Sequence, residues 1–352
     1  MRRLRLSSLF GLLALAVAAP ALRADLVWSP ARGWRVEGGA VSAFTGEGGR
    51  NALDLMNRAR SAEEAERYHR AVKLYKRVAN NYTKSIFAPE ACFRMAQAQI
   101  SLHDYTGAFA SYQQIMSLYP NYGKFGMVVG EQYRLASALA NGSRGRMLWG
   151  LLPGTTHREH SIVYFEQVVT NAPYSDYAPL ALMNVARLHL RFGNKIEAVD
   201  ALDRMINFYP QSILTPAAYL QMAKTHISLV DGPEYDQFSA KEASTYFQDF
   251  LILYPGDPNT EQAEKGLAQI KSEIANSKIK IAEFYHYKRK NYIAAKVLYN
   301  EAITTFPDSA VAKKARARLD AIAPKVAEQE ALMNRKPTDK PAPKHKRFLG
   351  LF

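Results

Sequence analysis

Cysteine is almost absent from this chain of 352 residues, in which Cys92 is the only one. A single thiol can form neither an internal disulfide nor a zinc site built from cysteines. Packing must therefore stabilise the interior, and hydrophobic residues make up 48% of the chain. Because Cys92 lies among core-type residues, we expect a small buried thiol and not a nucleophile.

Catalytic and cofactor-binding motifs are also lacking. No G-x-S-x-G or H-E-x-x-H sequence occurs. The glycine-rich run Gly46–Gly49 is not followed by the Lys-Ser/Thr of a phosphate-binding loop. The close histidine pair, His157 and His160, has no evident further metal ligand beside it. We therefore expect no enzyme, no catalytic residues, no metal, no cofactor and no small-molecule substrate.

Long apolar runs are missing apart from one near the start. Leu9–Ala19 is an apolar stretch that follows three arginines and precedes small residues. It is too short to span a bilayer comfortably, and this order of segments is typical of a secretory signal. We expect residues 1–24 to be a signal peptide cleaved after Ala24, and the chain to be exported. Cleavage after Ala21 and an uncleaved membrane anchor are the alternatives.

Acidic residues are scarce at both ends of the chain. The formal net charge is +14, but residues 1–24 hold four arginines and no acid, and residues 335–352 hold six Lys/Arg and one Asp. The remainder carries only roughly +5, so no concentrated basic face is evident and we expect no nucleic-acid partner. The Pro- and Lys-rich segment 335–352 is expected to be a disordered basic tail.

What the sequence does contain is an internal repeat. Each copy has a small residue, a large apolar or aromatic residue four positions later, an apolar residue three beyond that, and a proline after five more. Offsets of four and seven place the first three on one helical face, and proline ends the helix. The copies are Ala71-Tyr75-Val78 (with Thr83 for proline), Ala108-Tyr112-Ile115-Pro120, Ser161-Phe165-Val168-Pro173, Ala198-Leu202-Met205-Pro210, Ala243-Phe247-Phe250-Pro255 and Ala295-Tyr299-Ala302-Pro307.

A second signature follows the helix stops and starts the next helix. Ser85–Ala91, Ser175–Ala181 and Ser212–Ala218 each carry a proline suited to a first helical turn, and Ser309–Ala315 is a looser copy. The basic period of ~34–37 residues is that of paired tetratricopeptide helices. Excess spacing marks insertions near 141–158 and 230–240, and a lengthened helix within 258–290.

These patterns predict an all-α fold, a tetratricopeptide-repeat superhelical solenoid of about six helix pairs. We assign residues 51–334 to the solenoid and residues 25–50 to an irregular Gly-rich leader. Trp28 and Trp34 are expected to pack locally, fixing the leader to the first helices.

The exported start, the repeat and its linkers, together with one C-terminal segment, resemble the BamD family. The segment comprises Ala282-Glu283-Phe284-Tyr285, Lys290–Ala295 and Thr305–Ser309, and the resemblance covers roughly residues 50–322. BamD proteins are helical periplasmic subunits of the outer-membrane β-barrel assembly machine. Family members are usually lipoproteins with five repeats, whereas this chain has six repeat anchors and no acceptor cysteine after its apolar run, which predicts a divergent, non-lipidated member.

The resemblance implies a non-catalytic scaffold at the periplasmic face of the outer membrane. Its implied partners are proteins, namely the barrel-inserting outer-membrane subunit and unfolded outer-membrane proteins, including their C-terminal segments. The alternative is an exported tetratricopeptide coordinator of cell-wall or division enzymes.

Three surfaces are candidates for partner binding. Aligned first helices place six polar residues on one stripe that could grip peptide carboxylates and amides, the alternative being a solvated face. The insertion Asn141–His160 combines cations with an apolar core, as a binding knob or a loop that folds back. The tail pairs basic with aromatic residues and could touch a membrane, or simply fray. The candidate residues are Arg94, Gln97, Asn184, Arg187, Gln221 and Lys224 in the stripe, Arg144, Arg146 and Trp149 in the insertion, and Lys346, Arg347, Phe348 and Phe352 in the tail.

Overall fold

The computed structural model describes residues 25–37, 47–143, 146–147, 152–153, 158–230 and 237–334. Apart from two short hairpins and the turns that join the elements, these residues are helical, and they fall into two compact units divided between Leu188 and His189. The expected signal peptide and basic tail lie outside the described residues. None of the helices in the described ranges combines the length and the apolar character needed to cross a membrane.

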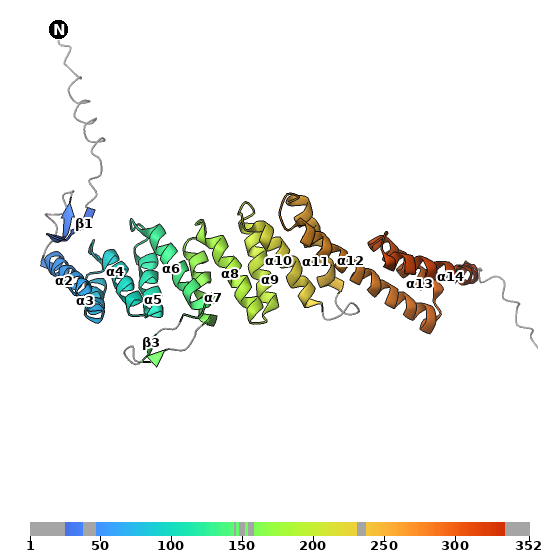
Figure 1. Ribbon diagram of the computed structural model, residues 1–352, viewed down its shortest axis with the longest axis horizontal. Coiled ribbons are helices and arrows are strands. Elements are labelled where there is room, and N and C mark those ends of the chain that lie inside the picture. The colour runs from blue at the N-terminus through green and yellow to red at the C-terminus, as the bar shows by residue number, and fades with distance from the viewer. Residues whose placement is uncertain are drawn as a thin grey trace, which may run out of the picture. The chain divides into compact units, whose positions relative to one another are not determined.

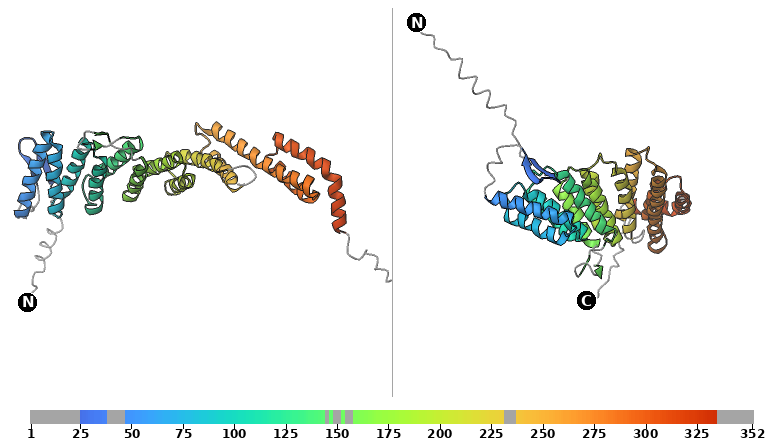
Figure 2. Two further views of the ribbon diagram at one scale, coloured as in Figure 1. Left: turned by 90° about the horizontal axis from the view of Figure 1, so that it is seen from below. Right: turned by 60° about the vertical axis from the view of Figure 1, so that its left-hand side comes forward.

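The first unit begins with a β-hairpin and continues as paired helices (Figure 1). In both views of Figure 2 its blue-to-green helices stack side by side. Its elements are β1 (Asp25–Ser29), β2 (Gly33–Glu37), α2 (Glu47–Glu64), α3 (Tyr68–Asn81), α4 (Ala88–Ser101), α5 (Tyr105–Leu118), α6 (Phe125–Ala140), β3 (Arg146–Met147), β4 (Leu152–Pro153), α7 (Arg158–Asn171) and α8 (Tyr177–Arg191), near whose end the division falls.

The second unit repeats the pairing and ends with an additional helix. Its elements are α9 (Lys195–Phe208), α10 (Thr215–Leu229), α11 (Gln237–Leu253), α12 (Thr260–Glu283), the π-helix η2 (Phe284–Arg289), α13 (Tyr292–Thr305) and α14 (Ala310–Asn334). In chain order the described helices run as successive first and second helices from α2/α3 to α12/α13, with α8 and α9 on either side of the division between the units and α14 following. The 24 residues of α12 confirm the predicted lengthened helix.

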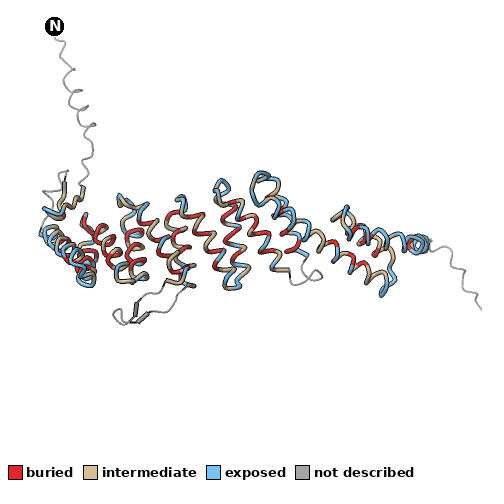
Figure 3. Tube along the Cα trace, viewed as in Figure 1, coloured by how far each residue is buried: buried red, intermediate tan, exposed pale blue. Residues whose placement is uncertain are grey.

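The repeat residues form the buried face of the second helix in every pair. In all six copies the small, large and apolar anchors are at most 2% exposed. They lie on α3, α5, α7, α9, α11 and α13. Figure 3 shows this burial as red stretches within each unit. The tetratricopeptide solenoid predicted from the spacing is therefore confirmed.

Helix starts and stops follow local chemistry. Proline lies in the first turn of α4 and of α10, where a missing N–H costs nothing. The Asp104 carboxylate caps α5 by accepting from the Gly107 amide at 2.9 Å. The α5 helix ends at Leu118, two residues before Pro120. These boundaries agree with the predicted linkers.

The segment expected to be an irregular leader differs from that expectation. Residues 25–37 form the β1–β2 hairpin, and α2 already begins at Glu47. The pairs Leu26↔Val36 and Trp28↔Trp34 put four apolar side chains on one face of the hairpin. That face packs on the core of the first helices, with Trp34 buried. Strands of five residues are too short for their alternation to stand out in a glycine-rich sequence.

Candidate functional site

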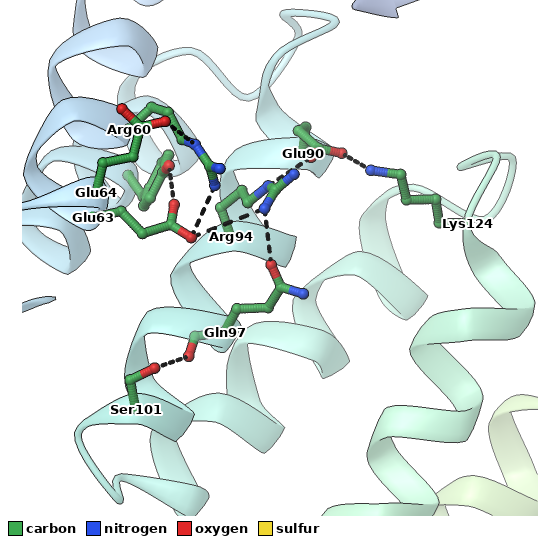
Figure 4. Close-up of polar contacts among 9 residues, drawn as sticks. Arg60, Glu63, Glu64, Glu90, Arg94, Gln97, Ser101 and Lys124 are labelled. Atoms are coloured by element: carbon green, nitrogen blue, oxygen red, sulfur yellow. Dashed lines mark hydrogen bonds and ion pairs between the residues drawn. The ribbon is translucent and has the colours of Figure 1, made fainter. Parts of the chain in front are cut away.

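The first helices of the first unit carry a network of charges centred on Arg94 (Figure 4). From α4, its Nε donates to the Glu90 Oε1 at 3.0 Å and its Nη1 donates to the Gln97 Oε1 at 3.2 Å. The same Nη1 lies 3.9 Å from the Glu63 Oε1 on α2. The guanidinium also lies 5.6 Å from the ring centroid of Trp34 in β2. Arg94 therefore links α2, α4 and the hairpin.

A buried carboxylate extends the network to the start of α6. Glu90 is 3% exposed and accepts hydrogen bonds from the Tyr122 hydroxyl and from Lys124 Nζ, the latter at 2.7 Å. Lys124 is the residue before α6, and its ammonium lies 5.0 Å from the Phe93 ring centroid. Burial, followed by the adjacent Glu90 carboxylate, raises the pKa of Tyr122 well above its ordinary value. The phenol therefore keeps its proton and remains a donor.

A second carboxylate–phenol pair lies on the other side of Arg94. The Tyr75 hydroxyl of α3 donates to the Glu63 Oε2 at 2.7 Å. Arg60 donates to Glu63 and Glu64 along α2. Burial and the Glu63 carboxylate raise the pKa of Tyr75 far above its usual range. Glu63 and Glu90 thus each have both cationic and phenolic donors around them.

This network changes the interpretation of Arg94 and Gln97. Both were predicted to face a bound peptide, but their side chains are hydrogen-bonded to each other. The Arg94 side chain is 22% exposed and already serves two carboxylates of its own chain. A peptide carboxylate would have to compete with Glu90 and Glu63. Arg94 and Gln97 therefore have a structural role, and their use in binding stays a prediction.

The second predicted pair, Asn184 and Arg187, lies on α8. Asn184 Nδ2 donates to the Tyr133 hydroxyl of α6 at 3.0 Å and to the Leu180 carbonyl at 2.9 Å. Its Oδ1 accepts from Arg187 Nη1 at 3.3 Å. Asn184 thus fixes one first helix to the next, while Arg187 is exposed as a residue.

The third predicted pair lies on α10 in the second unit. Lys224 is exposed, and its Nζ donates to the Gln262 Oε1 of α12 at 3.1 Å. Gln221 is half-buried, and its carbonyl accepts from the Thr225 hydroxyl at 2.7 Å. As in the first unit, successive first helices are joined by a polar side chain.

The remaining predicted site residues fall largely outside the described ranges. The structure places the backbone of Arg146 in β3, which pairs with β4. The insertion therefore contains a short hairpin. The other residues, Ala24, Arg144, Trp149, Lys346, Arg347, Phe348 and Phe352, lie outside the described residues.

Grooves lie at turns between helices in the described part of the first unit. One, of about 530 Å³, lies between the α3–α4 and α5–α6 turns and is lined by apolar and tyrosine side chains such as Ile86, Leu118 and Tyr119. Another, of about 300 Å³, lies at the α2–α3 turn beside Arg58, Arg67 and Arg70. Neither contains the predicted stripe residues.

Glu63, Glu90 and Lys124 belong to the network but were not predicted. The Glu90–Arg94 spacing of four along a helix is a signal that the sequence does carry. The approach of Glu63 and Lys124 depends on how neighbouring repeats pack, so no local pattern reveals it.

Other chemistry is sparse in the described part of the chain. There, no group of three or more His, Cys, Asp or Glu residues could hold a metal ion. Cys92 is fully buried in α4, and burial raises the pKa of its thiol to about 12. The predicted small buried thiol is confirmed.

The chain is similar to curated BamD proteins over part of its length. It is 25% identical to the "Outer membrane protein assembly factor BamD" of Pasteurella multocida, over 44% of this chain and 65% of the relative. It is 23% identical to the BamD of Xylella fastidiosa, over 42% of this chain and 54% of the relative. The chain thus spans about half the length of the curated relatives it matches.

Among solved structures, a tetratricopeptide repeat protein from Parabacteroides merdae is 12% identical, with a TM-score of 0.31, and covers 76% of this chain and 98% of its own. MamA from Desulfovibrio magneticus is 14% identical, with a TM-score of 0.30, and covers 61% and 99%.

Two family models match the chain. A tetratricopeptide repeat model matches residues 55–85 and 90–122, in the first helix pairs. The model YfiO, described as "Outer membrane lipoprotein", matches residues 159–336, which is just over half of the chain. The chain therefore belongs to the YfiO family of outer membrane lipoproteins, and its predicted resemblance to BamD is confirmed.

Proposed function

We propose that this protein is a non-catalytic periplasmic scaffold that binds partner proteins and peptide segments during the assembly of outer-membrane β-barrel proteins. The observation that carries the proposal is the family match over residues 159–336, together with curated relatives that are outer membrane protein assembly factors. The partners proposed are the barrel-inserting subunit and unfolded outer-membrane proteins. The place of action proposed is the periplasmic face of the outer membrane.

The architecture supports a scaffold. Successive first helices are cross-linked by polar side chains, α2 to α4 through Arg94, α6 to α8 through Asn184, and α10 to α12 through Lys224. These hydrogen bonds and ion pairs help to hold neighbouring first helices in a fixed geometry. A surface that is already ordered loses less entropy when it binds a peptide. Of the predicted stripe cations, Arg187 and Lys224 are exposed. We propose that each of them, within its own unit, makes a charged contact with a bound segment.

Co-purification tests the assembly role. Affinity-tagged protein isolated from its native envelope is expected to recover a barrel-inserting outer-membrane protein. Recovery of cell-wall synthases or division enzymes without it would overturn the proposal and favour a coordinator of those enzymes.

Charge reversal tests the binding residues. Arg187→Glu and Lys224→Glu are expected to weaken binding of an unfolded outer-membrane protein several-fold, because an attractive contact becomes repulsive. The control is Lys76→Glu, an exposed cation on the second helix α3. Equal losses in the control and the stripe variants would show a general charge effect and contradict the assignment of these two residues.

A further inference from the structure

The β1–β2 hairpin presents one edge to the helices and one edge away from them. Its register pairs Leu26 with Val36, Val27 with Arg35 and Trp28 with Trp34. Four of these side chains, Leu26, Trp28, Trp34 and Val36, form the face that packs on the helix core. The hairpin lies beside the first helices in Figure 1.

The hydrogen bond of one backbone amide fixes the pairing pattern. The Trp34 N–H donates to the Asn57 Oδ1 of α2 at 2.7 Å, so it does not point toward β1. In an antiparallel pair, opposed residues alternate between exchanging both backbone hydrogen bonds and exchanging none. Trp28 and Trp34 are therefore a non-hydrogen-bonded pair, and so are Leu26 and Val36. The N–H and C=O groups of Leu26 and Trp28 point to the outer edge of β1.

The two edges of the hairpin differ in their hydrogen-bond partners. The β2 edge lies against α2 and is bonded by Asn57. For the β1 edge, no group within the described residues hydrogen-bonds to the outward amides of Leu26 and Trp28. Folded proteins usually protect a free edge with lysine, proline, a bulge or a covering segment. The run Leu26-Val27-Trp28 contains neither lysine nor proline.

The hairpin is also firmly anchored. Arg60 of α2 lies 4.4 Å from the Trp28 ring centroid, and Arg94 of α4 covers Trp34. A two-stranded sheet is marginal alone, but an apolar face on helices and two cation–π contacts hold this one in place. The edge is thus preorganised to accept another strand.

We propose that β1 accepts an extended peptide as a third strand of this sheet. The added strand would pair its backbone with Leu26 and Trp28 and continue the two faces of the hairpin. One face is apolar and lies toward the helices, while the other carries Val27 and Arg35, so the fitting peptide alternates apolar and polar residues. This inference rests on the proposed function, since the strands of an unfolded outer-membrane barrel protein have that alternation.

A proline substitution tests the edge directly. Leu26→Pro removes the outward N–H while leaving the hydrogen bonds between β1 and β2, because proline is tolerated where a strand N–H faces solvent. Leu26→Ala loses the same packing and keeps the N–H. A fluorescein-labelled peptide of about ten residues with alternating valine and threonine is expected to bind the alanine variant at least tenfold more tightly than the proline variant. Equal affinities would overturn the inference.

Amide hydrogen exchange of the unaltered full-length protein gives a test that needs no variant. The amides of Leu26 and Trp28 are expected to exchange fast without peptide and to become protected with it, whereas the Val27 amide, bonded within the hairpin, is protected in both states. If the peptide binds without protecting Leu26 and Trp28, it binds elsewhere: the inference fails and the proposed function stands. If the peptide does not bind at all, the inference fails, and the co-purification of a barrel-inserting partner still decides the proposed function.

Discussion

At the scale of single residues, the charged side chains around Arg94 hold neighbouring repeats together. The alignment of the first helices predicts Arg94 as a cation available to a ligand. In the structure it lies between Glu63 and Glu90, which come from neighbouring repeats, and it also holds Gln97. Arg187 and Lys224, at the positions equivalent to Gln97 in later repeats, are exposed. The same position in a repeat can therefore be structural in one copy and accessible in another.

The buried carboxylate of Glu90 should be important for stability. Glu90→Ala leaves Arg94, Tyr122 and Lys124 without their shared acceptor, and breaking a buried pair in this way costs about 3 kcal/mol. Glu90→Gln keeps an accepting oxygen and should cost less. Urea unfolding followed by circular dichroism measures both. Equal stability of the alanine variant and the unaltered protein would show that the network contributes nothing.

Cys92 should react only when the chain unfolds. Its thiol is buried, and its pKa is raised from 9.0 to about 12. A raised pKa favours the protonated thiol in the folded state, so this contribution to stability is complete below pH 9 and is lost as the pH rises toward 12. A disulfide reagent at about pH 8, near the usual thiol pKa, should label the protein in urea but not in buffer. Cys92→Ala should reduce the alkaline loss of stability without abolishing it, because buried tyrosines such as Tyr75 also have raised pKa values. Rapid labelling of the folded protein would contradict this.

At the scale of elements, the backbone conformation of the turn between the two helices of a pair cannot be predicted from the sequence. Glu66, His103, Gly193 and Lys290 all have positive φ, and each lies two residues before a second helix begins. A left-handed residue there ends the first helix and turns the chain. Only one of the four is glycine, so composition gives no sign of the shared conformation. The proline-marked ends of the second helices, by contrast, were predictable.

Replacing glycine by alanine at one of these turns should lower the free energy of unfolding, and replacing a non-glycine residue by glycine at another should raise it. A Cβ added at Gly193 would meet no other atom within 4 Å, so Gly193→Ala should cost about 1 kcal/mol through its φ of +83° alone. Glu66→Gly, at an exposed residue with φ of 55°, should stabilise by about 0.5 kcal/mol. Thermal unfolding of both variants checks the signs. A stabilising Gly193→Ala would mean that the turn readily adopts another conformation.

At the scale of the whole molecule, export and attachment remain predictions from the sequence. Residues 1–24 have the order of a secretory signal, and cleavage after Ala24 would make Asp25, the first residue of β1, the mature N-terminus. The only cysteine is buried in α4. We propose that the basic and aromatic residues of the tail provide contact with the membrane.

Deleting residues 341–352 should release the protein from membrane fractions. The deletion removes three Lys/Arg residues together with Phe348 and Phe352, and such combinations of charge and apolar groups bind anionic bilayers. Sedimentation with vesicles that contain anionic lipid, compared with neutral vesicles, measures the effect. A substitution of Phe348 and Phe352 by serine separates insertion from charge attraction. Unchanged sedimentation of the deletion would exclude this contact.

The sequence by itself determined the repeat, because burial of one helical face every ~34–37 residues requires small and large residues at fixed offsets. It also determined the family, through the C-terminal helices and linkers. Only the tertiary structure decided that Arg94 is bound by its own chain, that the turns share a left-handed residue, and that no group of the described residues bonds to the outward amides of β1. Each of these depends on groups brought together across repeats or on backbone conformation, and neither is encoded in a local pattern of residue types.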